Sequence, residues 1–325
     1  MRVVHVATYD AQGGAARGAY RLHRGLCRAG HSSSMLVANK HCEDPTVQAL
    51  KPETQLFARL AQVLYRASIH WSLLRYRYTR PAGYESFSDD RSWHGTALLA
   101  QLPPCDVVNL HWVAGFVDHQ KFFRAVPTHT PVVWRLSDLN PLTGGCHYSA
   151  VCHKYRTGCE ACPQLGSTRK RDLAWQIWQR KKAAYGLVES GQLHLVAQSH
   201  WIAEEIGKSK LLGRFPVTVI PNGLDVDTFS PSERDVCRSE LGIADESRVV
   251  LFVSDLLNNR RKGFSFLLGA LKQLESYENL ILLSLGTSED ELGTSHRRIH
   301  LGRVTDDRLL AMVYIAADLF IIPSL

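Results

Sequence analysis

The sequence predicts an α/β fold made of two doubly wound parallel sheets. Short runs rich in Val, Ile and Leu alternate with helical patterns along the whole chain of 325 residues. Several of these runs are continuously apolar, as in strands that are buried on both faces of a parallel sheet. Repetition of strand, helix and strand over this length is typical of βαβ units. The chain is also longer than the ~100–200 residues of an ordinary domain, so two domains are expected.

The expected strands occur at intervals along the whole chain. In chain order they are residues 2–9, 33–38, 106–112, 131–138, 193–199, 217–221, 248–254, 280–286, 299–302 and 318–323. Helices fit between them. Residues Ala16–Ala29 are expected to form one helix, with Ala19, Leu22 and Leu26 on a common face, and residues Phe264–Ser276 another. Apolar residues three or four positions apart lie on the same face of an α-helix.

A change of composition at residues 219–233, VIPNGLDVDTFSPSE, marks the expected domain boundary. Proline, asparagine and glycine gather there, as they do in loops, and a fresh series of strands and helices follows. We therefore expect an N-terminal domain of residues 1–215, with a cysteine-rich insertion at 139–168, and a C-terminal domain of residues 216–325. Both are expected to be Rossmann-like and to face each other across a cleft.

The composition narrows the classes of protein. The opening run MRVVHVATYD is short, is interrupted by His5 and has no small-residue cleavage site behind it, which is unlike a signal peptide. No window approaches the ~18 consecutive apolar residues of a membrane-spanning helix. We therefore expect a cytoplasmic protein with reduced cysteines. The net charge of +7 suits anionic partners, but no nucleic-acid recognition motif is present, so no nucleic-acid partner is expected.

A glycine-rich turn follows the first expected strand. Gly13 and Gly14 lie between that strand and the next helix, where a backbone without side chains allows close approach of a ligand and the helix N-terminus favours an anion. The spacing is not that of the dinucleotide fingerprint, and the second strand ends in Asn39–Lys40 rather than in an acidic residue. A nicotinamide-dependent oxidoreductase is therefore disfavoured. The alternative is a turn that binds nothing.

A basic loop follows the expected strand at 248–254. Arg260, Arg261 and Lys262 precede Gly263 and an amphipathic helix. Guanidinium and ammonium groups at this place would bind a diphosphate and stabilise negative charge as it leaves. The alternative is a solvated basic loop. The strand–loop–helix context favours a binding role.

Four of the eight cysteines lie close together in the stretch GGCHYSAVCHKYRTGCEACPQLG, residues 144–166. Their spacing is C-x5-C-x6-C-x2-C, and two histidines lie among them. Thiolates of Cys146, Cys152, Cys159 and Cys162 would close a tetrahedral zinc site that stabilises a long excursion with little core of its own. Two alternatives remain: two disulfides, or free thiols packed as small apolar groups.

Polar residues end two of the expected strands. His111 and Asp138 follow apolar runs, and each is expected to point into the cleft, where it would orient a substrate hydroxyl. The alternative for both is a role as a local cap.

The stretch 55–80, QLFARLAQVLYRASIHWSLLRYRYTR, contains five arginines and no acidic residue. Aromatic and aliphatic side chains alternate with the arginines, a pattern that suits a helix lying on an anionic membrane surface. The alternative is an ordinary amphipathic helix with a solvated basic face.

Together these stretches resemble the retaining GT-B glycosyltransferases of glycosyltransferase family four. The resemblance rests on GGAARGA after the first strand, VIPNGLDVDTF at the boundary, RRKGFSFLLGAL, and the closing LGRVTDDRLLAMVYIAADLFIIPSL. It covers nearly the whole chain and is most specific from residue 217 onward. The cysteine stretch is similar to that of a subgroup which carries a Cys-rich loop at the same place.

The resemblance implies an enzyme that transfers a sugar, with retention, from a nucleotide-sugar donor to a glycan or lipid-linked acceptor in surface polysaccharide biosynthesis. It implies that Arg261 and Lys262 bind the donor diphosphate and that Gly13 and Gly14 lie near the same phosphates. The leaving phosphate would help to deprotonate the acceptor, and no catalytic metal would be required. Such an enzyme is expected in the cytoplasm, with peripheral contact at the inner face of the membrane.

Two departures from the family pattern alter these expectations. Ser137 stands where many relatives carry a histidine that contacts the donor sugar, and His111 is a candidate to replace it in part. In the family, a helix with the pattern E-x7-E follows the closing strand, whereas this sequence stops at Leu325. We therefore expect a truncated enzyme with impaired transfer. The alternative is an accessory protein that binds an acceptor or a nucleotide without catalysis.

Overall fold

The computed structural model describes residues 1–95, 97–257, 259–287 and 294–325. The chain divides into two compact units, Met1–Gly223 and Leu224–Leu325. Strand β7 (Val217–Val219) pairs with β6 (Leu193–Ala197) and therefore belongs to the first unit, although the sequence placed residues 216–221 in the second. None of the helices in the described ranges combines the length and the apolar character that crossing a membrane requires.

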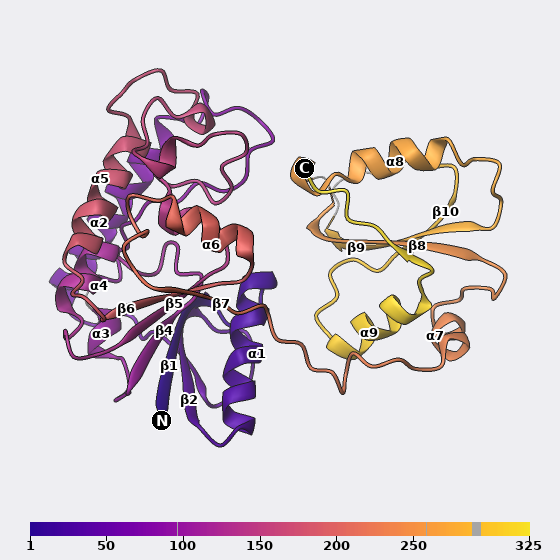
Figure 1. The fold of residues 1–325 in the computed structure, drawn as a ribbon, viewed down its shortest axis with the longest axis horizontal. Helices are drawn as coiled ribbons and strands as arrows, with labels where there is room; N and C mark the ends of the chain where they lie inside the picture. The colour runs from indigo at the N-terminus through magenta and orange to yellow at the C-terminus, as the bar shows by residue number, and fades with distance from the viewer. Residues whose placement is uncertain (96, 258, 288–293) are drawn as a thin grey trace. The chain divides into compact units, whose positions relative to one another are not determined.

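The first unit is built on a parallel sheet of seven strands, counted over the described residues (Figure 1). Its strands are β1 (Arg2–Tyr9), β2 (Ser32–Asn39), β3 (Val47–Ala49), β4 (Val107–Leu110), β5 (Val132–Leu136), β6 and β7. They stand in the order β3-β2-β1-β4-β5-β6-β7, which is the order of a doubly wound sheet. The direction of winding reverses between β1 and β4. The predicted α/β class is confirmed.

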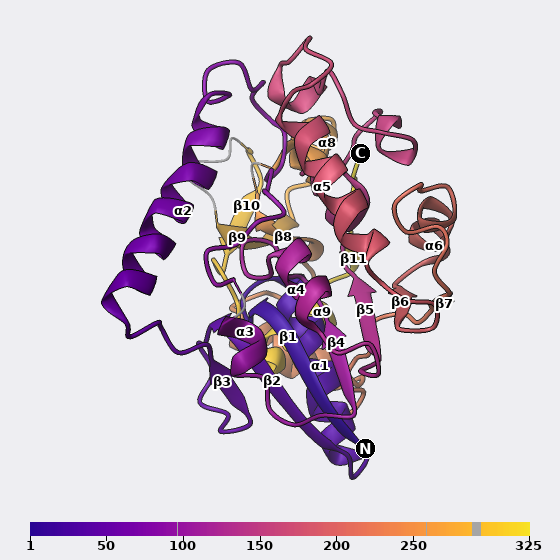
Figure 2. The same cartoon turned by 90° about the vertical axis from the view of Figure 1, so that its left-hand side faces the viewer.

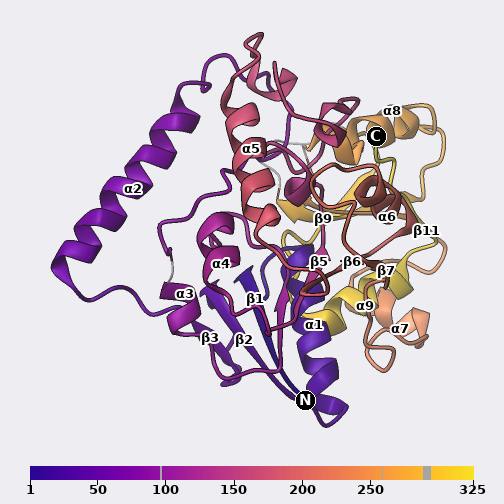
Figure 3. The same cartoon turned by 60° about the vertical axis from the view of Figure 1, so that its left-hand side comes forward.

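Helices cover both faces of this sheet. They are α1 (Gly14–Arg28), α2 (Leu56–Leu74), α3 (Ala97–Ala100), α4 (His119–Ala125), α5 (Leu173–Gly186) and α6 (His200–Gly207). Figures 1 and 3 show α1 on one face, with α4 and α5 packed together on the other. The residues that follow β5 also form three short 3-10 turns, at Asn140–Leu142, Lys154–Arg156 and Pro163–Leu165.

The buried faces follow from the sequence with one exception. In β1 the six residues from Val3 to Thr8 are all buried, as the continuous apolar run predicted. In α1 the prediction was partly wrong, because Ala19 is buried but Leu22 is 40% exposed. His23 is buried in its place, since both of its ring nitrogens find hydroxyl partners inside the unit.

The second unit contains a parallel sheet in the order β10-β9-β8-β11, again over the described residues. Its strands are β8 (Arg248–Leu256), β9 (Leu280–Thr287), β10 (Arg297–His300) and β11 (Leu319–Phe320), and its helices are α7 (Arg234–Glu240), α8 (Phe264–Lys272) and α9 (Asp307–Ala316). Within this unit, α8 covers one face of the sheet and α7 and α9 the other (Figure 1).

Both faces of β8 are buried. Val249 and Leu251 belong to the cluster that includes α9, whereas Val250 and Phe252 belong to the cluster that includes α8. Successive side chains of a strand point to opposite faces, so an uninterrupted apolar run satisfies both layers. Asp318, just before β11, accepts hydrogen bonds from the backbone N–H of Val249 and from the buried guanidinium of Arg238, and it thereby ties β11 to β8 and α7.

Candidate functional site

Both sheets have a switch point, and the predicted ligand-binding residues lie there. In an open α/β sheet, ligands bind beyond the carboxyl ends of the strands where the winding direction reverses. In the first unit this place is the carboxyl end of β1 and β4. In the second unit it is the carboxyl end of β8 and β11.

The glycine turn after β1 forms the start of α1. Gly13 has φ 81° and ψ 162°, a backbone conformation that favours glycine, and it caps α1 without a side-chain hydrogen bond. No atom lies within 4 Å of the Cβ positions of Gly13 and Gly14, so the space beside the turn is open. The first turn of α1 contains no acidic residue. The first N–H groups of α1 and the positive end of its helix dipole therefore favour an anion here.

His111 is buried at the carboxyl end of β4 and does not face solvent. Its Nε2 lies 2.8 Å from Nδ1 of His5, and its Nδ1 lies 3.5 Å from Nη1 of Arg135. Burial, followed by the charges of His5 and Arg135, holds the pKa of His111 well below its usual range. The imidazole is therefore neutral. The expectation that His111 itself points into a cleft is corrected, because both of its nitrogens have partners inside the unit.

Arg135 is the group in contact with His111 that the sequence analysis missed. Its side chain is buried, and its Nη2 donates a hydrogen bond to Oδ1 of Asn222, which lies in the boundary stretch 219–233. A Cβ at Gly18 of α1 would lie 2.6 Å from this Nη2, so a larger residue there would displace the guanidinium of Arg135. Within the described residues Arg135 has no carboxylate partner. The signal was visible in the sequence: a lone arginine inside an apolar strand.

Asp138 is held by three donors. Its Oδ2 accepts hydrogen bonds from Nε1 of Trp112 at 2.7 Å and from Nδ1 of His147 at 2.5 Å, and its Oδ1 accepts from the backbone N–H of Asn140 at 2.9 Å. The other nitrogen of His147 lies 2.8 Å from Oγ of Ser88. Asp138 thus connects the end of β4 to the cysteine-rich stretch, which is a positioning role.

The structure nevertheless brings His111 and Asp138 to one pocket. This pocket lies at the carboxyl ends of β4 and β5. Its walls come from residues 111–114, 134, 136–138 and 140–141, which include Ser137. Nε2 of Gln198 donates a hydrogen bond to the hydroxyl of Ser137 at 2.9 Å. The arrangement offers polar groups that can orient a hydroxyl.

The Arg-Lys turn lies at the switch point of the second unit. Residues Arg260–Lys262 form a 3-10 turn that Asn259 caps, because its Oδ1 accepts a hydrogen bond from the backbone N–H of Arg261 at 3.0 Å. The side chains of Arg261 and Lys262 are half-buried, and that of Arg260 is exposed. Gly263, with φ 72°, caps α8 without a side chain.

The segment after β11 packs directly on this turn. A Cβ at Gly263 would lie 1.8 Å from the carbonyl oxygen of Pro323, and the backbone N–H of Leu325 donates a hydrogen bond to the carbonyl oxygen of Arg261 at 2.9 Å. The segment after β11 therefore fixes the position of the basic turn. Two basic side chains and an uncapped helix N-terminus are the groups that bind a diphosphate.

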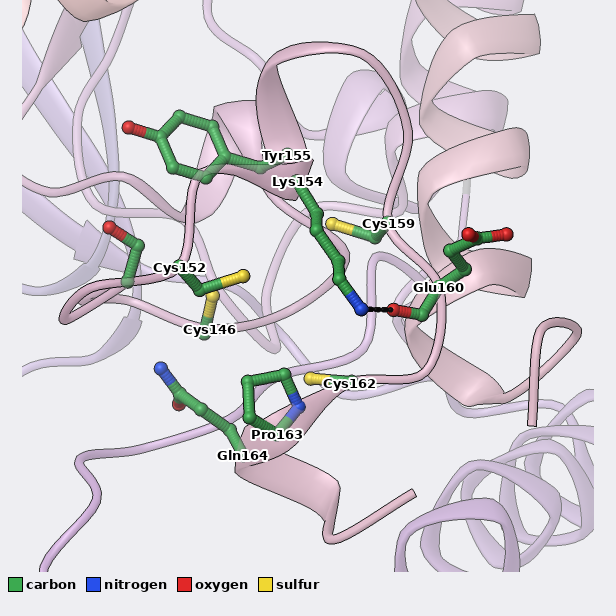
Figure 4. Close-up of a pocket in the computed structure, with 10 residues that line it drawn as sticks. Cys146, Cys152, Lys154, Tyr155, Cys159, Glu160, Cys162, Pro163 and Gln164 are labelled. Carbon is green, nitrogen blue, oxygen red and sulfur yellow. Dashed lines mark hydrogen bonds between the residues drawn. The ribbon is translucent and has the colours of Figure 1, made fainter. Parts of the chain in front are cut away.

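The four cysteines of the predicted zinc site line one pocket in the first unit (Figure 4). Cys146, Cys159 and Cys162 are buried, Cys152 is half-buried, and all are free thiols in the structure. The two-disulfide alternative is therefore not the state that the structure shows. Within the described residues, no three or more His, Cys, Asp or Glu side chains already stand in the geometry of a metal site.

Comparison with known proteins identifies this arrangement. No family model matches the chain. Sucrose-phosphate synthase from Thermosynechococcus elongatus superposes on 100% of this chain and 76% of its own, with TM-score 0.56 and 16% identity. Anabaena Alr3699/HepE in complex with UDP-glucose covers 100% of this chain and 74% of its own, with TM-score 0.55 and 15% identity. WaaG, a glycosyltransferase involved in lipopolysaccharide biosynthesis, covers 99% of this chain and 75% of its own, with TM-score 0.51 and 16% identity. The fold is GT-B.

Two curated relatives agree with the GT-B fold at the level of sequence. WcaC of Escherichia coli (strain K12), named as a colanic acid biosynthesis glycosyl transferase, is 28% identical over 113 residues, or 33% of this chain and 27% of WcaC. D-inositol 3-phosphate glycosyltransferase of Mycolicibacterium smegmatis is 28% identical over 143 residues, or 40% of this chain and 32% of that protein. The match thus spans about a third or less of either relative. Both relatives carry glycosyltransferase names, which agrees with an enzyme by resemblance.

Proposed function

We propose that this chain is a glycosyltransferase that moves a sugar, with retention, from a nucleotide-sugar donor to a glycan or lipid-linked acceptor in surface polysaccharide biosynthesis. The observation that carries the proposal is the place of Arg261 and Lys262, at the switch point of the second sheet of a GT-B fold. The names of WcaC and WaaG support a role in polysaccharide synthesis, and the UDP-glucose complex of HepE supports a nucleotide-sugar donor.

The donor diphosphate would bind at the N-terminus of α8. Arg261 and Lys262 would balance its charge, and the backbone N–H groups after Gly263 would donate hydrogen bonds to its oxygens. These groups stabilise the nucleoside diphosphate most strongly as it leaves, because its negative charge is then greatest. Electrostatic stabilisation of a developing charge by prepositioned donors is a large source of rate enhancement.

The transfer itself would break the bond between the anomeric carbon and the diphosphate oxygen and form a bond from the same carbon to the acceptor oxygen. The acceptor hydroxyl would lose its proton to the departing phosphate. No protein side chain is required as the general base, which agrees with the neutral, fully bonded state of His111. The first unit would position the acceptor, with Asp138 holding Trp112 and the pocket wall in place.

Binding of UDP to the chain tests the donor site. Arg261→Ala and Lys262→Ala are each expected to weaken binding roughly 10-fold to 100-fold, since a hydrogen bond to a charged group contributes about 1.5–3 kcal/mol. Arg260→Ala is the matched control, because Arg260 belongs to the same turn but has an exposed side chain. Equal effects of all three substitutions on titration calorimetry would refute the assignment of Arg261 and Lys262.

Turnover is tested separately from binding. Release of UDP from UDP-glucose, with and without membrane lipid extract as a source of acceptor, is expected to depend on Arg261. UDP binding with no release from any nucleotide-sugar would favour the alternative, a binding protein without catalysis. Comparison of UDP, ADP and GDP in the binding assay identifies the base.

We also propose that α2 contacts an anionic membrane surface. Of its side chains only Ile69 is buried, and Figures 2 and 3 show the helix along the border of the first unit. Its outer side exposes large apolar residues, with Phe57 85% and Leu64 72% exposed. The stretch 55–80 carries five arginines and no acidic residue, which is complementary to anionic lipid.

Vesicle sedimentation tests this contact. The chain is expected to bind vesicles that contain phosphatidylglycerol and not vesicles of phosphatidylcholine alone. The double substitution Phe57→Ser and Leu64→Ser should abolish binding, whereas Val226→Ser, an exposed apolar position in the second unit, should leave it unchanged. Retention of binding by the α2 variant would exclude this helix as the membrane contact.

A further inference from the structure

The cysteine-rich stretch has little regular structure but holds its four cysteines together. Between the 3-10 turns at Lys154–Arg156 and Pro163–Leu165 the chain forms loops, and the side chains of Cys146, Cys152, Cys159 and Cys162 line the same pocket (Figure 4). Cysteines separated by up to 16 positions meet here without a disulfide. Four thiols gathered in one place are the ligand set of a structural zinc site.

Two of the four sulfurs have backbone N–H donors beside them. The backbone N–H of Gly144 donates to Sγ of Cys159 at 3.1 Å. The backbone N–H groups of Gln164 and Leu165 are placed to donate to the sulfur of Cys162. The hydroxyl of Thr143 donates to the carbonyl oxygen of Cys146 at 2.6 Å and not to its sulfur. A neutral thiol is a weak acceptor, whereas a thiolate bound to a metal is a strong one. The backbone is thus arranged for thiolates.

Positive charge is also placed beside the sulfurs. The ammonium of Lys181 is completely buried, and its contacts in the described residues are oxygens of Asn140 and Thr143, the nearest at 2.5 Å from the carbonyl of Asn140. The carboxylate of Asp90 is the strongest opposing charge on Lys181, followed by Cys146 and Cys159. A buried ammonium is costly unless an anion compensates it. A zinc ion with four thiolates carries two net negative charges and would add to the compensation that Asp90 supplies.

A buried polar atom at the same pocket lacks a partner. Oε1 of Gln164 is the one buried side-chain oxygen or nitrogen without a hydrogen bond in the described part of the chain, although Nε2 of the same amide donates to the carbonyl of Tyr148 at 2.5 Å. Gln164 lines the cysteine pocket. An unsatisfied buried oxygen marks a place where a bound species or an ordered water belongs.

The histidines of the stretch are not available as ligands. Nδ1 of His147 is bonded to Asp138 and Nε2 to Ser88, so neither lone pair faces the pocket. His153 is exposed. The ligand set is therefore restricted to the four sulfurs.

We propose that Cys146, Cys152, Cys159 and Cys162 bind one zinc ion as thiolates and that this ion holds the cysteine-rich stretch together. Because the sulfurs do not already surround one point, binding must draw them together, and the half-buried Cys152 has the most freedom to move. The site is structural, since four protein ligands leave no open position for substrate. The proposal is independent of the proposed transferase activity.

Elemental analysis of the chain, purified without chelator, tests the proposal directly. About one zinc per chain is expected, as for a closed four-thiolate site. Cys159→Ser and Cys162→Ser are expected to lose the zinc. Cys105→Ser is the matched control, because Cys105 is a half-buried thiol of the same unit outside the pocket, and it should keep the metal.

Cobalt substitution keeps the test informative if the variants fail to fold. The wild-type chain, reconstituted with Co²⁺ in place of zinc, should show the thiolate-to-cobalt charge-transfer band and the intense visible bands of a tetrahedral thiolate site. Absence of zinc from the purified chain, together with an octahedral cobalt spectrum, would overturn the proposal. An intact mass lower by two hydrogens for each pair of cysteines would overturn it in favour of disulfides.

Discussion

Gly263→Ala is the substitution whose effect the structure defines best. Gly263 has φ 72°, a left-handed conformation that costs an alanine ~1–2 kcal/mol. The new Cβ would also lie 1.8 Å from the carbonyl oxygen of Pro323, which belongs to the backbone and cannot rotate away. Displacing packed backbone costs ~1–3 kcal/mol. The free energy of unfolding of the second unit should therefore fall by roughly 2–5 kcal/mol.

Gly242→Ala separates the two contributions. Gly242 lies in the same unit and has φ 64°, but no atom lies within 4 Å of its Cβ position. It should lose only the conformational ~1–2 kcal/mol. The difference between the two variants then reports the contact between the Arg-Lys turn and the segment after β11.

Urea unfolding followed by two probes measures the effect. All seven tryptophans lie at or before residue 201, so tryptophan fluorescence follows the first unit, whereas circular dichroism follows both. Gly263→Ala should move the unfolding of the second unit to lower urea concentration. This shift should be visible in circular dichroism and not in tryptophan fluorescence. UDP affinity should fall as well, because the turn moves. Equal destabilisation by Gly263→Ala and Gly242→Ala would refute the packing of Pro323 on the turn.

Three further predictions follow from buried polar groups of the first unit. Burial holds the pKa of His5 at about 3 and that of His111 well below its usual range, so the unfolded chain binds protons that the folded chain does not. The free energy of unfolding, measured by urea titration, should therefore fall as the pH drops below about 6.5. The His5→Gln variant should show a smaller dependence on pH. Asp138→Asn removes a carboxylate that accepts from His147, and thermal unfolding should show a loss of about 1–3 kcal/mol. Burial raises the pKa of Glu205, but hydrogen bonds from Arg156, Tyr155 and Lys208 outweigh burial and lower this pKa to about 2. The stability that Glu205 contributes is therefore present above its unfolded pKa near 4.3 and is lost as the pH falls toward 2. The stability of Glu205→Gln should depend less on pH in that window, and an unchanged acid transition would contradict this.

The sequence predicted the features that depend on long apolar runs. β1 and β8 are buried on both faces because their runs of apolar residues are nearly continuous, so neither face of the strand is polar. The Arg-Lys turn and the glycine turn were also placed correctly, since a strand followed by glycine and a helix is a local pattern. β3 was missed because three residues carry no periodicity.

The polar interior of the first unit was not predictable from such patterns. His23 replaces Leu22 on the buried face of α1 because Ser33 and Thr46, far along the chain, satisfy its nitrogens. His111 was wrongly expected to face a ligand. The sequence pattern of a histidine after a strand is the same whether its partner is a substrate or another side chain, here His5. Only the three-dimensional position of the partner distinguishes the two cases.

The pairing of β11 with β8 has a consequence for how the second unit folds during synthesis. β8 is the first strand of this unit to leave the ribosome, yet the carboxylate that caps its Val249 amide belongs to Asp318, 69 positions later. Until that residue emerges, one edge of β8 and the apolar side chains beneath it remain open to other strands. A chaperone that shields an unpaired strand edge would have its longest opportunity to act in this interval, whereas the first unit can already be complete.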